Sequence, residues 1–271
     1  MAKITDNDRI LFNTKIAPFR KEVEAILKEE KEAQILLKSK SPATALKRLD
    51  MSDAMLNLAS NYMVICGISQ SMQNQKSEEA LNDARKTLYK SVIYLEEVIT
   101  NLLDAPFSEY EDQLDTIESV TPAQRFFLVR KMGLAIQLLK QAYGDNSKWK
   151  WGFVELEGRH AALTKNMINL KDVMVNSDPR SPHYEPVILH LRLARKLLLD
   201  SANRYREKYE LSTSNIDDFK KGISYICALR RLNILTGARL DAAIAEKKYK
   251  IWTNKLQSDM NRLEILASRK G

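Results

Sequence analysis

Glu157 and His160 are the residues of this sequence whose types and spacing best match a metal-binding motif. Three residues apart on a helix, their side chains share one face. A dinuclear carboxylate site in a helical bundle needs a second Glu-x-x-His pair and two further glutamates. Neither His183 nor His190 has a glutamate three residues before it. One half-motif does not fill a coordination sphere, so we predict no metal and no cofactor, and we expect His160 at the surface or at a helix end.

Two tryptophans precede this pair and alternate with basic residues in Lys148-Trp149-Lys150-Trp151. Alternation is unusual inside a helix and fits a helix entry, with Asn146 or Ser147 as the cap. Two interpretations stay open: both indole rings pack inside a helical bundle, or one of them stays exposed and anchors a protein partner. A third candidate anchor, Trp252, lies among lysines near the carboxyl end.

The sequence carries no recognisable catalytic motif. No Gly-x-Ser-x-Gly and no glycine-rich phosphate loop occurs. Two carboxylate pairs share helix faces, Asp50 with Asp53 and Asp112 with Asp115. Neither pair has a companion cluster, so a solvated surface is a better interpretation than a general acid and base. We predict no catalytic residue and no enzymatic activity, and keep a bundle enzyme with a carboxylate site as the third hypothesis.

Long helices must position all of these residues. The 271 residues include only 8 glycines and 7 prolines, and apolar residues recur at three- and four-residue spacing. Ser41-Pro42 and Thr121-Pro122 each combine an N-cap with a proline in the first turn, whereas Pro18 predicts a kink or a break. A short helix is expected at 109–118, and a break near Thr236-Gly237. The seven long helices are predicted at about 5–38, 42–72, 77–103, 122–143, 149–175, 186–209 and 214–269.

This pattern predicts an all-α fold, an antiparallel bundle of about seven long helices. The longest polar, proline-bearing stretch runs from Ser177 to His183. We therefore predict an N-terminal helical bundle at 1–176, a hinge at 177–185, and basic C-terminal helices at 186–271 that pack on the bundle. A single domain without a hinge remains the alternative.

The net charge of +8 is concentrated near the carboxyl end. Residues 190–271 hold 18 Lys and Arg against 9 Asp and Glu, whereas residues 1–189 hold 25 against 26. Between Lys90 and Arg125 there is no basic residue, and there are eight acidic ones. This acidic stretch is either solvated or docked on the basic helices of the same molecule. Alternatively, the two poles meet different partners, or the same partner head-to-tail.

Ten basic residues of the last helices are the predicted binding site for an acidic partner or a phosphate group: Arg192, Arg195, Lys196, Arg204, Arg206, Arg230, Arg231, Arg239, Lys247 and Lys248. We predict a non-enzymatic scaffold or adaptor that uses them to bind an acidic protein surface or a second copy of itself. The alternative is RNA or DNA binding by the same helices, with Tyr249 and Trp252 interleaved among lysines. No helix-turn-helix, zinc-finger or RNP signature supports that alternative.

The expected location is the cytoplasm. The amino-terminal segment MAKITDNDRILF lacks the apolar core of a secretory leader, and no run of 18 apolar residues predicts a membrane span. Cys66 and Cys227 each lie in an apolar helical pattern, where buried free thiols in a reducing compartment are expected. A disulfide between two helices is the alternative.

Overall fold

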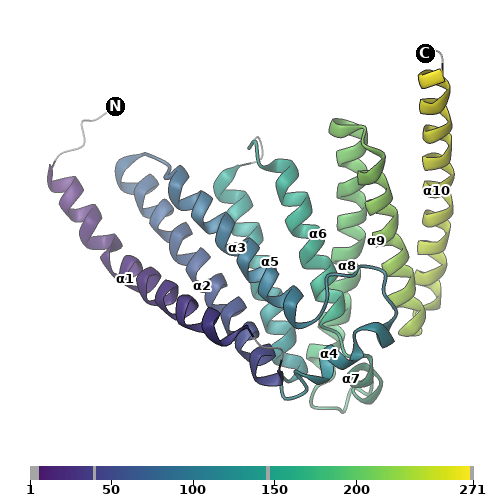
Figure 1. The fold of residues 1–271 in the computed structure, drawn as a ribbon, viewed down its shortest axis with the longest axis horizontal. Coiled ribbons are helices and arrows are strands. Elements are labelled where there is room, and N and C mark those ends of the chain that lie inside the picture. The colour runs from purple at the N-terminus through teal and green to yellow at the C-terminus, as the bar shows by residue number, and fades with distance from the viewer. Residues whose placement is uncertain (1–5, 39–40, 145–146, 269–271) are drawn as a thin grey trace. The chain divides into compact units, whose positions relative to one another are not determined.

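The computed structural model describes residues 6–38, 41–144 and 147–268, and it is built from helices (Figure 1). Within these ranges no β-strand occurs, which confirms the predicted all-α class. No helix there is both long enough and apolar enough to cross a membrane. The long helices are α1 (Asp6–Leu36), α2 (Pro42–Gln73), α3 (Glu78–Val98), α5 (Pro122–Tyr143), α6 (Lys150–Asn166), α8 (Tyr184–Lys208), α9 (Ile216–Leu235) and α10 (Arg239–Ser268). Shorter elements are η1 (Phe107–Glu109), α4 (Glu111–Asp115), α7 (Leu170–Val175) and the π-helical turn η2 (Tyr209–Thr213).

Local sequence signals set where two of the long helices begin. At the start of α2 the Ser41 hydroxyl accepts a hydrogen bond from the Thr44 backbone N at 3.3 Å, and Pro42 lies in the first turn. Before α5, the Thr121 backbone N donates to Gln124 Oε1 at 2.9 Å in the same reciprocal arrangement. Both predicted caps are confirmed, because each satisfies amide groups that the first helical turn leaves without partners.

The start of α6 agrees with the predicted helix entry. The Ser147 hydroxyl accepts a hydrogen bond from the Trp149 backbone N at 3.2 Å, and the helix begins at Lys150. The other predicted cap, Asn146, and the predicted helix ends at residues 5 and 269 lie outside the described residues.

Pro18 does not break the first helix. α1 is one helix from Asp6 to Leu36 with the proline inside it. Pro18 and Thr14 are both exposed, so water can satisfy the Thr14 carbonyl that loses its intrahelical donor. The helix therefore continues through the proline.

The helix predicted over residues 149–175 is two helices. α6 ends at Asn166, whose side chain donates to the Leu102 carbonyl at 3.0 Å. α7 begins after Asn169, whose side-chain oxygen accepts from the Lys171 backbone N at 2.9 Å. Asparagine side chains compete with helical backbone bonding, and these two end one helix and start the next.

The predicted break near Thr236-Gly237 is confirmed. α9 ends at Leu235, Gly237 has a φ of +71°, and α10 begins at Arg239. Glycine takes this left-handed conformation without the penalty that a Cβ would bring. The break turns the chain so that α10 runs back along α9 (Figure 1).

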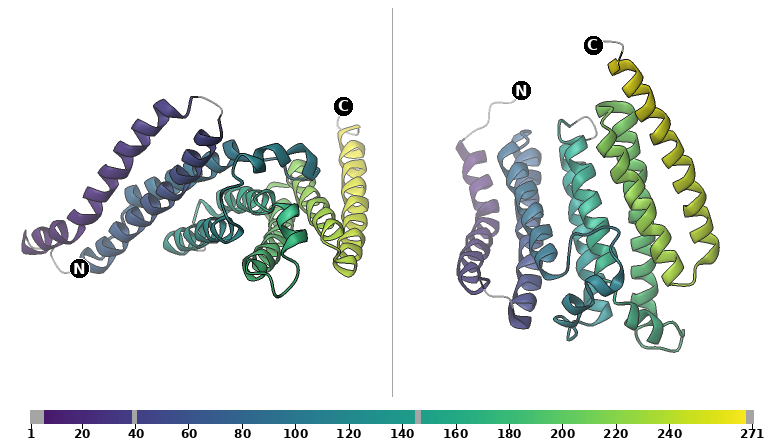
Figure 2. Two further views of the ribbon diagram at one scale, coloured as in Figure 1. Left: turned by 90° about the horizontal axis from the view of Figure 1, so that it is seen from below. Right: turned by 45° about the vertical axis from the view of Figure 1, so that its right-hand side comes forward.

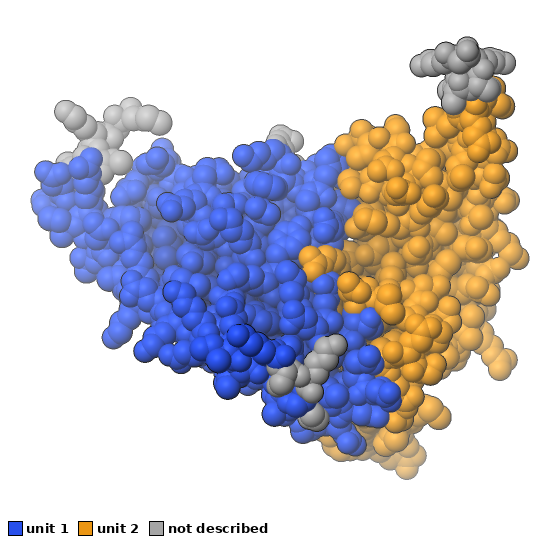
Figure 3. Space-filling view, in the orientation of Figure 1, with its two compact units in different colours: residues 1–100, 112–156 blue, residues 101–111, 157–271 orange. Residues whose placement is uncertain are grey.

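The helices divide into two compact units (Figure 3). Unit 1 comprises residues 1–100 and 112–156, and unit 2 comprises residues 101–111 and 157–271. The division falls inside α6, and the segment 177–185 lies entirely within unit 2. A hinge at 177–185 stays a prediction.

In unit 1, α2 packs against α1, α3 and α5. Its residues Met51, Met55 and Leu58 are at most 1% exposed and form one buried cluster with Ala33 of α1. Burial of such side chains is the main favourable contribution to folding. α1 is therefore held to this unit through its second half.

In unit 2, α9 lies between α8 and α10 and runs antiparallel to both (Figure 2). Phe219 of α9 is fully buried, with its ring stacked on Tyr209 at 5.0 Å between centroids. Gly222 allows α8 to come close, because a Cβ at this position would lie 3.1 Å from the Ala202 carbonyl. The three helices therefore form one layer, with α9 in the middle and α8 and α10 on either side of it.

Candidate functional site

A groove of about 740 Å³ runs along unit 2, with α9 as its floor and α8 and α10 as its walls. We call it the α8–α10 groove. Each helix contributes one face, since the lining residues repeat at three-, four- and seven-residue spacings. They are Arg195, Lys196, Leu199 and Arg206 of α8, Ile226, Leu229 and Asn233 of α9, and Asp241, Ile244, Ala245, Lys247, Lys248, Ile251 and Trp252 of α10.

The floor and walls of the groove are largely apolar. Ile226 and Leu229 are buried at the floor, while Leu199, Ile244 and Ile251 expose 36%, 67% and 57% of their surfaces. Removing such apolar surface from water is favourable by roughly 25 cal/mol per Å², before the costs of association. Apolar residues gathered on one exposed surface are typical of a binding site.

Trp252 closes one end of the groove and is not a free anchor. It is 2% exposed, and its ring centroid lies 5.9 Å from that of Phe219. The Arg206 guanidinium carbon and Lys248 Nζ each lie 5.1 Å from the Trp252 ring centroid. The predicted role of Trp252 as an exposed anchor is therefore wrong, because its large apolar surface is already buried in unit 2.

The two cations over Trp252 repel each other. Burial, followed by the charge of Arg206, lowers the pKa of Lys248 below its usual value. Arg206 Nε lies 2.9 Å from a carboxylate oxygen of Glu210. No carboxylate in the described part of the chain pairs with Lys248, whose Nζ donates to Asn203 Oδ1 at 3.0 Å. A carboxylate placed between the two cations would relieve the repulsion.

The opposite end of the groove contains polar atoms without partners. Asn233 is 2% exposed, and its Oδ1 accepts no hydrogen bond. On the α8 wall, an Arg195 terminal nitrogen donates to Thr236 Oγ1 at 2.6 Å, but Arg195 Nε is buried without an acceptor. A buried polar atom without a partner costs about 1–3 kcal/mol. A ligand that supplied the missing partners would recover part of that free energy.

The ten predicted basic residues differ in their surroundings. Four of them pair with carboxylates at 2.6–3.0 Å: Arg204 with Glu207, Arg206 with Glu210, Arg230 with Glu246, and Arg231 with Asp104. The other six have no carboxylate partner among the described residues: Arg192, Arg195, Lys196, Arg239, Lys247 and Lys248. Five of the ten line the α8–α10 groove, namely Arg195, Lys196, Arg206, Lys247 and Lys248.

The acidic stretch between Lys90 and Arg125 docks in part on the basic helices. Arg231 Nε donates to Asp104 Oδ1 at 2.8 Å within unit 2. A second acid of the same stretch, Glu111, lies 2.7 Å from Lys171 Nζ. Lys171 lies in α7, outside the basic helices, so docking on those helices holds for Asp104, and it removes Arg231 from the free cationic surface.

Trp149 and Trp151 are both half-buried in unit 1. The guanidinium carbon of Arg85 lies 4.0 Å from the centroid of the Trp149 ring, and Lys150 Nζ lies 4.9 Å from that of Trp151. Each ring is thus covered on one face by a cation of its own chain. An anchoring role for either tryptophan stays a prediction.

His160 is buried and not at the surface, contrary to expectation. It is 2% exposed. The residues that follow it in α6, Ala161 to Leu163, are also buried, so this part of the helix is buried on all sides. Within the described residues, no group of three or more His, Cys, Asp and Glu side chains is placed to hold a metal ion. Of the predicted carboxylate pairs, Asp53 accepts a hydrogen bond from Lys131 at 2.6 Å, and Asp50 is exposed.

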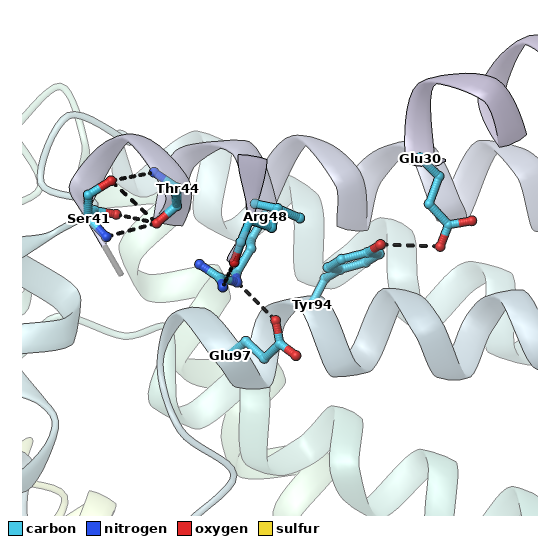
Figure 4. A network of polar contacts seen from close by, with 7 residues as sticks. Glu30, Ser41, Thr44, Arg48, Tyr94 and Glu97 are labelled. Atoms are coloured by element: carbon cyan, nitrogen blue, oxygen red, sulfur yellow. Dashed lines mark hydrogen bonds and ion pairs between the residues drawn. The ribbon is translucent and has the colours of Figure 1, made fainter. Parts of the chain in front are cut away.

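Unit 1 contains a crevice of about 980 Å³ between α1, α2 and α3. Several of its charged side chains bind one another or a nearby hydroxyl (Figure 4). Arg48 Nε donates to Glu97 Oε2 at 2.9 Å, and Glu30, only 4% exposed, accepts from Lys90 Nζ at 2.8 Å and from the Tyr94 hydroxyl at 3.2 Å. Because these groups already have partners, the crevice is a weaker candidate than the α8–α10 groove.

Lys165 and Tyr110 are a buried pair that the sequence analysis missed. Each is 5% exposed, and Lys165 Nζ lies 5.1 Å from the Tyr110 ring centroid. Burial lowers the pKa of Lys165 to about 8 and raises the pKa of Tyr110 to about 12. Apolar residues near Lys165 in the sequence, Ala161 to Leu163 and Met167, were a usable signal of its burial.

Both cysteines are free thiols, which confirms the predicted unbridged state. Cys66 is 3% exposed, and Cys227 is half-buried. Burial raises the pKa of Cys227 above its usual value. A thiol with a raised pKa stays protonated at neutral pH and is a poor nucleophile.

The model of the TP0443 family matches residues 8–260 of the chain. The matched range includes every residue of the α8–α10 groove. No curated protein and no solved structure matches the chain.

Proposed function

The chain belongs to the TP0443 family, and we propose that its α8–α10 groove binds an acidic amphipathic helix of a partner protein. In this proposal the protein is a non-enzymatic cytoplasmic adaptor, and unit 2 provides the binding surface. The observation that carries the proposal is a groove with an apolar lining and an excess of cations along its walls.

The groove has the dimensions of a helix-binding site. Arg195 and Arg206 are eleven residues apart on α8, which is roughly 16 Å, or three helical turns. α8 and α10 both pack on α9, and the groove lies along these three helices. A fourth helix there would complete a four-helix arrangement and cover Ile244 and Ile251, which are more than half exposed.

The charges of the groove favour an acidic partner. Five basic side chains line it against one carboxylate, that of Asp241. Lys196 and Lys247 are exposed, and neither pairs with a carboxylate of the described residues. Complementary charge speeds association and discriminates between partners.

Nucleic acid fits the same groove less well. Phosphate backbones bind through cations and gain little from an apolar lining, and single-stranded bases need exposed aromatic rings. The aromatic ring of the groove, Trp252, is buried. Binding to a polynucleotide, or self-association of the chain, would therefore contradict the proposal.

The free thiols support a cytoplasmic location. Neither Cys66 nor Cys227 is bridged. Thiols persist in a reducing compartment, whereas secreted domains tend to convert them to disulfides.

Fluorescence anisotropy with a labelled, designed acidic amphipathic helical peptide tests the proposal. Wild-type protein should bind the peptide. Ile244→Asp should weaken binding about tenfold or more, because it places a carboxylate in the apolar wall opposite an acidic ligand. The matched control is Leu240→Asp, since Leu240 is 83% exposed on the same helix but does not line the groove. Binding to this control should equal that of wild type.

Three results would contradict the proposal. Equal binding to both aspartate variants would put the peptide elsewhere on the protein. Binding to RNA or DNA of any sequence, falling steeply with salt and without binding to the peptide, would favour the nucleic-acid alternative. A dimer in light scattering that Ile244→Asp dissociates would identify a second copy of the chain as the occupant.

A further inference from the structure

We infer that the helix bound in the α8–α10 groove carries a carboxamide side chain, Asn or Gln, opposite Asn233, and a carboxylate about eleven residues away, opposite Arg206 and Lys248. This inference rests on the proposed function and specifies which acidic helix the groove selects. It is argued from the polar atoms at the two ends of the groove and from the distance between them.

At one end of the groove, one acceptor atom and one donor atom have no hydrogen-bond partner. Asn233 Oδ1 needs a donor, and Arg195 Nε needs an acceptor; both atoms are buried without partners. They belong to the same end, because Arg195 bonds Thr236, which lies three residues after Asn233 on α9. A carboxamide offers an N–H donor and a carbonyl acceptor together, whereas a carboxylate offers no donor and a lysine no acceptor.

At the other end, Arg206 already pairs with Glu210, whereas the partner of Lys248 is the neutral side chain of Asn203. Arg206 and Lys248 both lie over the ring of Trp252, and no carboxylate of the described residues pairs with Lys248. A ligand carboxylate at this end would gain a charge-assisted contact with Lys248 and lessen its repulsion with Arg206.

The floor helix gives the distance between the two ends. A Cβ on Gly222 would lie 3.6 Å from both the Arg206 backbone N and the Trp252 ring, so Gly222 is level with the cationic end. Asn233 comes eleven residues later on α9, roughly 16 Å along the axis. Eleven residues are close to three full turns, so two ligand residues with this spacing face the groove together.

The spacing also sets the register of the ligand. Residues four and seven positions from the carboxamide share its face and would lie level with Leu229 and Ile226 of the floor helix. A single polar residue in an otherwise apolar helical interface excludes slipped registers, because a shift leaves its partner buried and unsatisfied. Asn233 is the groove residue that would exclude slipped registers of the ligand helix.

The test uses three designed, labelled helical peptides of equal length, with leucines at the fourth and seventh positions after the carboxamide. The first has Asn and Glu eleven residues apart. The second has Leu in place of that Asn, and the third has the Glu moved two residues, to the opposite face. Wild-type protein should bind the first about tenfold more tightly than either of the others, because each change leaves polar or charged groups of the groove unsatisfied.

The variant Asn233→Leu should reverse the preference between the first and second peptides. Circular dichroism checks that this variant is folded, and the comparison of the three peptides on wild-type protein does not depend on it. If wild type binds all three peptides equally, with binding still lost in Ile244→Asp, the inference is overturned while the proposed function stands. If none of the peptides binds wild-type protein, the proposed function is overturned as well.

Discussion

Lys248 of α10 and Asn203 of α8 are joined by a hydrogen bond of 3.0 Å from Nζ to Oδ1. Lys248 lines the α8–α10 groove, whereas Asn203 is a residue of α8 that lies outside the groove lining, so this bond ties the α10 wall to α8. It is made by the one lysine of the groove that is repelled by Arg206. In the free protein, Asn203 therefore accepts a hydrogen bond from the lysine that an acidic ligand in the groove would pair with.

Replacing Asn203 with Ala should raise the affinity for the acidic peptide. A neutral hydrogen bond contributes about 0.5–1.5 kcal/mol, so removing the competing acceptor should strengthen binding roughly two- to tenfold. Asn203 is exposed, and its loss should leave the thermal stability of the protein unchanged. Anisotropy titrations measure the effect, and unchanged or weaker binding would show that Lys248 does not contact the ligand.

Lys165 should make the stability of the protein rise with pH in the alkaline range. Its pKa is about 8 in the folded protein and near 10.5 when exposed, so between these values the unfolded chain binds more protons. Stability should therefore increase from pH 8 to pH 10 by up to about 3 kcal/mol, at 1.36 kcal/mol per unit. Above pH 10 the raised pKa of Tyr110 acts in the opposite direction, because the unfolded chain then loses the tyrosine proton first.

Urea unfolding of wild type and Lys165→Met at pH 7, 8, 9 and 10 checks this prediction. The variant lacks the buried amine, so it should be more stable than wild type at pH 7 and show no rise from this source. Parallel curves for the two proteins across this pH range would mean that Lys165 is not the cause.

Gly158 and Gly67 should respond in opposite directions to replacement by alanine. A Cβ at Gly158 of α6 would clash with the Tyr225 hydroxyl and lie 3.0 Å from the Tyr205 ring, so Gly158→Ala should cost roughly 1–3 kcal/mol. Gly67 in α2 has no atom within 4 Å of the added Cβ, so Gly67→Ala should stabilise by up to about 1 kcal/mol through helix propensity.

Thermal denaturation of the two alanine variants measures both effects. Equal stability of the two variants would show that the stacked rings of Tyr205 and Tyr225, whose centroids lie 5.5 Å apart, move aside without cost.

Replacing Glu30 with Gln should lower the pKa of Tyr94. Burial and then the charge of Glu30 raise this pKa to about 12, and the Tyr94 hydroxyl donates to Glu30 Oε1 at 3.2 Å. Glu30→Gln removes the charge, so the tyrosinate absorbance should appear at lower pH than in wild type. Glu29→Gln is the matched control, since Glu29 is half-exposed and pairs with Lys47. If both variants titrate like wild type, burial alone accounts for the raised pKa.

Much of the secondary structure could be predicted because its signals are local. A cap such as Ser41 or Thr121 acts on amides within three residues, and Gly237 acts on its own backbone. The predicted helix boundaries were wrong where two local signals compete. Asn166 and Asn169 interrupt an apolar pattern that otherwise reads as one helix, and the exposed Pro18 costs α1 a hydrogen bond without ending it.

By itself the sequence determined the helices, their order and the concentration of basic residues near the carboxyl end. Tertiary structure decided which of those cations keep a free charge. Arg231 is neutralised by Asp104, 127 residues away in the sequence, whereas no carboxylate of the described residues pairs with Lys247. The α8–α10 groove and the burial of Trp252 have the same origin. They exist because α8 and α10 pack on the two sides of α9, and which faces of separate helices meet is not encoded in any one helix's periodicity.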